Sequence, residues 1–142
     1  MTRFDVMPDG YEDKEYKPKN AEGQSKLIIP GELPTMNEII DASKQHWAKY
    51  KQMKDNYQAR VEFYAKNQRI PFFEKVDLEI IYYRKNRMYD PDNIVAGKKF
   101  ILDGLQKVGC IKNDGWKEIN SFKETWKIDE ENPRTEVILT DC

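Results

Sequence analysis

The sequence predicts a single α+β domain, a small mixed sheet with two main helices in the order β-α-β-α-β-β. The 142-residue length is enough for one domain with its own core. Two segments repeat apolar residues at helical spacing, and shorter segments rich in β-branched or aromatic residues lie around them. The aromatic content of 12% argues against wholesale disorder, although 35% of the residues are charged.

The N-terminal segment differs in character from the rest of the chain. Residues 1–25 are polar, contain turn-forming residues and show no sustained period, so we expect an extension or flexible arm. The domain is then expected over residues 26–142, beginning with a short strand at Lys26–Ile29. After a Pro-containing loop, Thr35 or Asn37 can cap the helix that follows.

A long segment without Gly or Pro predicts the first helix, over Glu38–Asn67. Its apolar residues recur at steps of three, four and seven and include Ile39, Ile40, Trp47, Tyr50, Tyr57, Val61 and Tyr64. The next segment, Val76–Tyr83, alternates in the manner of a half-buried strand. It leads directly into a basic loop and an acidic motif.

The second helix is expected over Asn93–Val108, with Asp92 or Asn93 as its N-cap and Gly109 at its C-terminal end. Its buried face would carry Ile94, Ile101, Leu105 and Val108. Two further strands are expected around residues 118–127 and 135–140, joined by a turn.

Cysteine content and hydropathy favour a cytoplasmic protein with no membrane contact. Cys110 and Cys142 form neither a CxxC pair nor a disulfide framework, and Cys110 is expected in the core. No apolar run approaches the roughly 18 residues of a membrane helix, and the N-terminus lacks a signal-peptide pattern.

Charge is distributed unevenly along the chain. The net charge is −1, yet residues 26–127 carry 19 basic and 14 acidic side chains, a net +5. Within this body, Arg84, Lys85 and Arg87 form a cluster that could meet phosphates, although surplus lysine also occurs on ordinary solvated surfaces.

The acidic motif is Asp90-Pro91-Asp92-Asn93, followed by Asn113-Asp114-Gly115. In an extended segment, carboxylates at i and i+2 project to the same side, and Pro91 favours that conformation before it. Paired carboxylates are costly without a cation, and their hard oxygens suit Mg²⁺. The helix after Asn93 can return the chain so that Asp114 joins the pair. Both motifs are also ordinary turn and capping sequences.

A lysine on the second helix could assist such a site. Asp92, Lys99 and Asp103 fall on one helical stripe, and helical side chains lean toward the N-terminus, so Lys99 could direct its ammonium toward a phosphate at the metal. A simple Lys99–Asp103 surface pair explains the same spacing. The single histidine, His46, leaves no usual zinc site or His-dependent triad, so any catalysis depends on carboxylates and lysine.

Three segments together resemble the RusA family of Holliday-junction resolvases. They are the run from Arg84 to Asn93, the run from Lys98 to Leu105 (KKFILDGL) and the run from Gly109 to Asp114. Pro30–Asn37 resembles the Pro-rich, Asn-containing strand end of that family. The resemblance covers about residues 27–140.

The resemblance implies a homodimeric, Mg²⁺-dependent endonuclease of phages and prophages that cuts four-way DNA junctions in recombination and repair. Mn²⁺ is a possible substitute for the metal. The implied residues are the metal-binding catalytic acids Asp90, Asp92 and Asp114, the catalytic lysine Lys99, the supporting residues Asn93 and Asp103, and the DNA-binding residues Arg84, Lys85, Arg87, Lys98 and Asn37.

Two departures and two alternative functions stay open. The helix is longer than the family pattern, so Lys98 competes with Lys99 for the lysine role. Family members often have two adjacent acids where this chain has Asn113-Asp114. The alternatives are a non-catalytic DNA-binding phage accessory protein and another Mg²⁺-dependent phosphoryl-transfer enzyme, although no nucleotide-binding glycine loop accompanies the acids.

Overall fold

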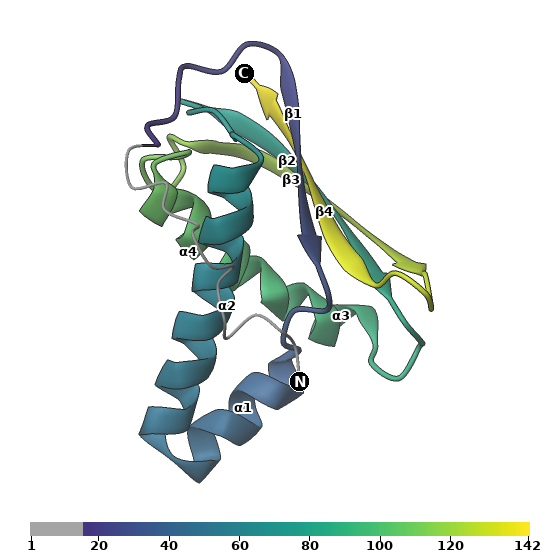
Figure 1. Cartoon of the computed structure of the whole chain (residues 1–142). Helices are drawn as coiled ribbons and strands as arrows, with labels where there is room; N and C mark the ends of the chain where they lie inside the picture. Colours follow the sequence, from purple (N-terminus) through teal and green to yellow (C-terminus); the bar gives the residue numbers. More distant parts are fainter. Residues whose placement is uncertain (1–15) are drawn as a thin grey trace.

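The computed structural model describes residues 16–142, which form a mixed sheet with helices packed against one of its faces (Figure 1). The strands of this part of the chain are β1 (Gln24–Pro30), β2 (Val76–Arg84), β3 (Ile119–Ile128) and β4 (Arg134–Asp141). Their spatial order is β1-β4-β2-β3. The β1–β4 and β2–β4 pairs are antiparallel, whereas β2 and β3 are parallel. The α+β class and the mixed sheet are confirmed.

All four expected strands form, and β2 shows the alternation of side chains that predicted them. Its side chains alternate strictly between buried and half-buried positions. The buried set faces the helices and consists of Val76, Leu78, Ile80, Tyr82 and Arg84. Because β4 and β3 both pair with β2, its edges are covered and its inner side chains form the centre of the core.

The first helical segment is two helices, not one. α1 (Met36–Gln45) and α2 (Trp47–Asn67) are separated by His46, which has extended backbone (φ −169°, ψ 138°). The Nδ1 atom of His46 accepts a hydrogen bond from the Ala48 N–H, so this side chain caps α2. Prediction of a continuous helix over Glu38–Asn67 was wrong because neither Gly nor Pro marks the break.

The second helical segment is also interrupted near its start. It consists of α3 (Pro91–Ile94), a 3₁₀ turn η2 (Val95–Gly97) and α4 (Lys98–Val108). A Cβ on Gly97 would lie 2.9 Å from the Leu33 Cβ, so the tight turn occurs where a neighbouring loop packs closely. The expected continuous helix from Asn93 was therefore wrong. The expected end at Gly109 is confirmed, with φ 93°.

The described part of the N-terminal segment is not a free arm. Lys19 and Ala21 form backbone hydrogen bonds with Phe72, and the Tyr16 hydroxyl donates to the Ile70 carbonyl. These contacts attach residues 16–23 to the segment between α2 and β2, which corrects the expectation for that stretch. Residues 1–15 lie outside the described residues.

α2 and α4 pack against each other and against the sheet, and a glycine sets how close the two helices come. A Cβ on Gly104 of α4 would lie 2.5 Å from Cγ1 of Val61 on α2. Both helices contribute fully buried side chains, including Val61, Ala65, Phe100, Ile101 and Leu105. Cys110 is in the core as expected, and burial raises the pKa of its thiol to about 12.

We expect Gly104→Ala to destabilise the fold. Alanine improves helix propensity by about 1 kcal/mol, but the overlap with Val61 forces displacement of packed atoms that costs roughly 1–3 kcal/mol. The difference between these two effects is a net loss of up to about 2 kcal/mol in the free energy of unfolding, measured by denaturant unfolding. Gly115→Ala is the matched control, because its new Cβ would meet only Glu118 Oε1 at 3.5 Å. Equal stability of the two variants would contradict the close helix contact.

Candidate functional site

The acidic turn lies just beyond the end of β2 and differs from the expected extended segment. Asp90 has extended backbone (φ −74°, ψ 157°) and is the N-cap residue of α3, although its side chain makes no capping hydrogen bond. Asp92 already lies in the first turn of the helix. The i, i+2 alternation that predicted a shared side therefore does not apply. Both carboxylates are nevertheless exposed and lie two residues apart at the start of one helix.

Asn93 connects this turn to the beginning of α1. Its Oδ1 atom accepts a hydrogen bond from the Asn37 N–H at 2.9 Å. That N–H is one of the donors left unpaired at a helix N-terminus, so Asn93 acts as a cap for a helix distant in sequence. Thr35 and Glu38 form a capping box on the same helix. The backbone N–H of Asn37 is thus engaged in holding the acidic turn.

Arg84, at the end of β2, holds the segment that precedes the acidic turn. Its guanidinium donates to the Leu33 carbonyl at 3.2 Å, ion-pairs with Glu32 at 3.5 Å and lies 5.9 Å from the Tyr89 ring centroid. Its side chain is 9% exposed. These partners hold the loop and leave little of the Arg84 guanidinium exposed, so the DNA-contact role expected for Arg84 stays a prediction. Lys85 is exposed, and its backbone N–H donates to Glu32.

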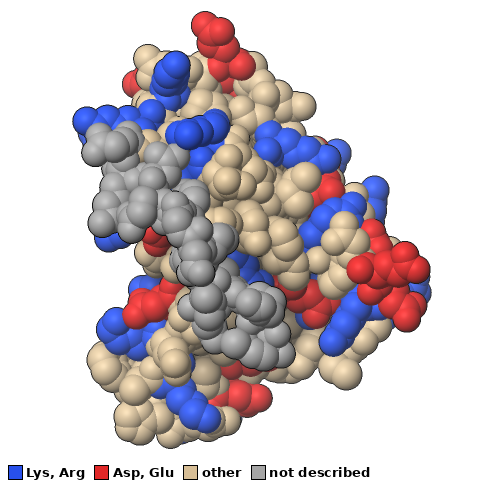
Figure 2. Space-filling model, viewed as in Figure 1, with Lys and Arg blue, Asp and Glu red and all other residues tan. Residues whose placement is uncertain are grey.

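Arg87 is the other exposed cation of this loop. Figure 2 shows Lys and Arg side chains spread over this face of the molecule, and a group of acidic side chains beside some of them at its right-hand end. That end carries the turn between β3 and β4, with Asp129, Glu130 and Glu131. Lys85 and Arg87 are therefore the cations of the expected basic cluster that remain available to a phosphate.

Lys98 belongs to a group of polar side chains at the β3 edge of the sheet, on the face that the helices cover. Its ammonium lies 3.0 Å from Glu124 Oε1 and 4.4 Å from the Phe122 ring centroid. The Tyr82 hydroxyl donates to the other Glu124 oxygen at 2.7 Å. Burial, together with Glu124, raises the pKa of Tyr82, so it remains the donor. The ammonium group of Lys98 is thus bound to side chains of β3.

Lys99 is the more accessible of the two lysines, with half of its side chain exposed. Its ammonium lies 3.8 Å from Asp103 Oδ2, one turn further along α4. The side chain therefore points away from Asp92, contrary to the expected lean toward the acids. Because this exposed pair is long, its attraction is weak and leaves Lys99 able to adopt other rotamers.

Asp114 does not join Asp90 and Asp92. α4 carries the chain back along the sheet, and Glu118 then hydrogen-bonds to Val76 at the start of β2 (Figure 1). Asp90 follows the far end of that strand. The nine residues of β2 correspond to roughly 26 Å between its ends. Asp114 is exposed, beside a Trp116 that is 99% exposed.

One chain consequently supplies only part of the expected metal site. Among residues 16–142, no group of three or more His, Cys, Asp or Glu side chains is arranged to hold a metal ion. Asp90 and Asp92 offer the hard oxygen ligands that suit Mg²⁺, but the third carboxylate of the expected set lies at the other end of the sheet.

The chain matches no family model, and no curated protein matches it significantly in sequence. Within the described residues, none of the helices is both long enough and apolar enough to span a bilayer.

Sequence reasoning missed the partners of Lys98 and a group of lysines around α4. The Tyr82–Glu124–Lys98 group joins β2, β3 and α4, and no local spacing reveals it. A group of lysines around α4 was missed for the same reason, although Lys99 and Lys107 at i and i+8 were a partial signal.

We expect Arg84→Ala to destabilise the domain, because it leaves Glu32 and the Leu33 carbonyl without their buried partner. The unfolding free energy should fall by about 2–3 kcal/mol, measured by denaturant unfolding. Arg87→Ala is the matched control and should change it by less than about 0.5 kcal/mol. A stable Arg84→Ala protein whose only defect is in DNA affinity would support the DNA-contact role.

Proposed function

We propose that the protein is a Mg²⁺-dependent, structure-specific endonuclease of the cytoplasm that resolves four-way DNA junctions as a homodimer. The observation that carries the proposal is the acidic turn itself. Asp90 and Asp92 are exposed, while Asn93–Asn37 and Arg84–Glu32 hold the backbone on both sides. These contacts connect the two segments, residues 30–37 and 84–93, that resemble the RusA resolvases. An exposed acid pair on a fixed backbone is suited to a metal-dependent reaction at a phosphodiester.

The residues have four roles in this proposal. Bound Mg²⁺ would neutralise the scissile phosphate and supply the means of activating water. Asp90 and Asp92 provide carboxylate ligands, and Asn93 positions their turn. Lys99, which is the freer lysine, offers positive charge for the phosphate in the transition state. Lys85 and Arg87 hold flanking phosphates without reading sequence.

A homodimer is supported by the edge strand β3. In the sheet order β1-β4-β2-β3, one side of β3 has no neighbouring strand among the described residues. Phe122, Trp126 and Ile128 on this strand are 41%, 41% and 47% exposed, and Trp116 precedes it. A long edge strand that carries several exposed apolar side chains is a surface that proteins often cover, and pairing with a second copy would cover it.

Such pairing also explains where the third carboxylate comes from. Two β3 strands related by a twofold axis pair antiparallel, so the start of one strand, near Ile119, lies beside the end of the other, near Ile128. Asp114 precedes Ile119, and Arg84, which pairs with Ile128, leads to the acidic turn. Asp114 of one copy would then approach Asp90 and Asp92 of the other. Two such composite sites suit paired cuts in a symmetric junction.

We expect Asp92→Asn to bind a labelled mobile four-way junction with unchanged affinity but not to cleave it, because the amide removes a charged metal ligand. The assay compares cleavage with and without Mg²⁺, and a linear duplex tests structure specificity. Normal cleavage by the variant excludes Asp92 from the site. Binding without cleavage by the unaltered protein, at any Mg²⁺ or Mn²⁺ concentration, would favour a non-catalytic DNA-binding protein.

Mixing two inactive variants tests the composite site. In a mixed dimer of Asp92→Asn and Asp114→Asn chains, one site carries both substitutions and the other carries neither. After subunit exchange, about a quarter of all sites should be intact, and they should nick single strands of the junction. Each variant alone should stay inactive. A mixture that also stays inactive would mean that Asp114 does not act across the dimer.

A further inference from the structure

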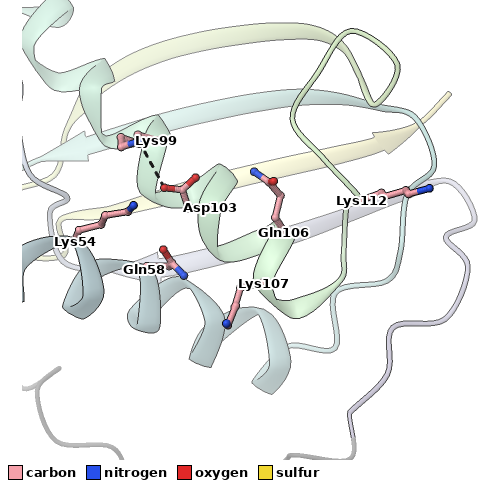
Figure 3. Close-up of a pocket in the computed structure, with 7 residues that line it drawn as sticks. All are labelled: Lys54, Gln58, Lys99, Asp103, Gln106, Lys107 and Lys112. Atoms are coloured by element: carbon pink, nitrogen blue, oxygen red, sulfur yellow. Dashed lines mark ion pairs between the residues drawn. The ribbon is translucent and has the colours of Figure 1, made fainter. Parts of the chain in front are cut away.

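An open hollow of about 460 Å³ lies between α2 and α4, on the side of α4 that faces away from the sheet (Figure 3). α4 lines it with Lys99, Asp103 and Lys107, α2 contributes Lys54, and the segment after α4 contributes Lys112. The close approach of α2 and α4 at Gly104 brings these side chains from three segments together.

The hollow is strongly basic. Four lysines and a single carboxylate line it, and that carboxylate, on Asp103, is already paired with Lys99. Within residues 16–142, Lys54, Lys107 and Lys112 have neither an ion pair nor a hydrogen-bond partner. Like charges gathered without counter-charges repel one another, so this arrangement favours an anionic ligand.

The shape indicates what kind of anion fits. Lys99 and Lys107 are eight residues apart on α4, roughly 12 Å along the helix axis. One strand of duplex DNA rises about 3.4 Å per nucleotide, so this row spans three to four phosphates. The side-chain amides of Gln58 and Gln106 each donate one hydrogen bond within the protein, to Glu62 and to the Leu102 carbonyl, and each keeps a second N–H for a phosphate. The lining is polar, open and built from flexible side chains, which suits a polyanion more than an enclosed small molecule.

We propose that this hollow binds the sugar-phosphate backbone of a DNA arm through Lys54, Lys107 and Lys112. The proposal rests on the junction-resolving function above and adds to it a path for one arm. Lys99, seven residues beyond Asp92, is at the end of the row that is closer in sequence to the acidic turn. An arm held along α4 leads away from that turn, which fixes the angle at which the junction lies on the protein.

The test is the salt dependence of binding to a fluorescent four-way junction in EDTA, where no cleavage occurs. In the variant Lys54→Gln/Lys107→Gln/Lys112→Gln, the slope of log K against log salt should fall by about three, because each lost phosphate contact lowers it by roughly one. Affinity at moderate salt should fall at least about tenfold. Thermal unfolding of the variant should change little, since within residues 16–142 the three ammonium groups form no ion pair or hydrogen bond.

A control with the same change in net charge separates this site from general attraction. Lys19, Lys44 and Lys75 are exposed, belong to other parts of the surface and do not line the hollow. Their triple substitution by glutamine should leave the slope within about one of the original. Equal loss in both triple variants, or no loss in the first, overturns the proposal. Because EDTA removes cleavage, a failure of the nuclease function appears only in the Mg²⁺ assay and leaves this result readable.

Discussion

The parallel pairing of β3 with β2 is the constraint on which the rest of the structure depends. Parallel neighbours cannot be joined by a tight turn, so the chain must travel back along the sheet before β3 begins. α4 provides this return path, and its inner face completes the core beneath β2. The same path carries the chain from the acidic turn at one end of β2 to Asp114 at the other.

The same pairing determines what is exposed on two surfaces used in the proposals, the outer edge of β3 and the polar face of α4. Because β3 is the last strand to be added on its side, its outer edge and several apolar side chains remain uncovered in one chain. Because α4 must bury its apolar face against the sheet, its polar face turns outward beside α2 and gathers lysines there. The uncovered edge of β3 and the row of lysines beside α4 follow from the same connection.

Side-chain contacts with distant residues lie around the two acids of the turn and do not involve the acids themselves. Within residues 16–142, the side chains of Asp90 and Asp92 form no hydrogen bond or ion pair, whereas Asn93, Arg84 and Glu32 all contact residues distant in the sequence. Side chains that look like candidates for DNA or metal binding in a motif thus separate into two groups. One group holds the backbone in place, and the other remains exposed for a ligand.

The sequence by itself determined the strands, the helical segments and the end of α4 at Gly109, because alternation, helical spacing and a positive φ are local properties. It also pointed to the acidic turn. Only the tertiary structure decided that His46 breaks a helix, that Arg84 is buried and that Lys98 and Lys99 point to different partners. The separation of Asp114 from Asp92 likewise could not be predicted from the sequence. Strand order and pairing direction set it, and both arise from contacts between residues far apart in the chain.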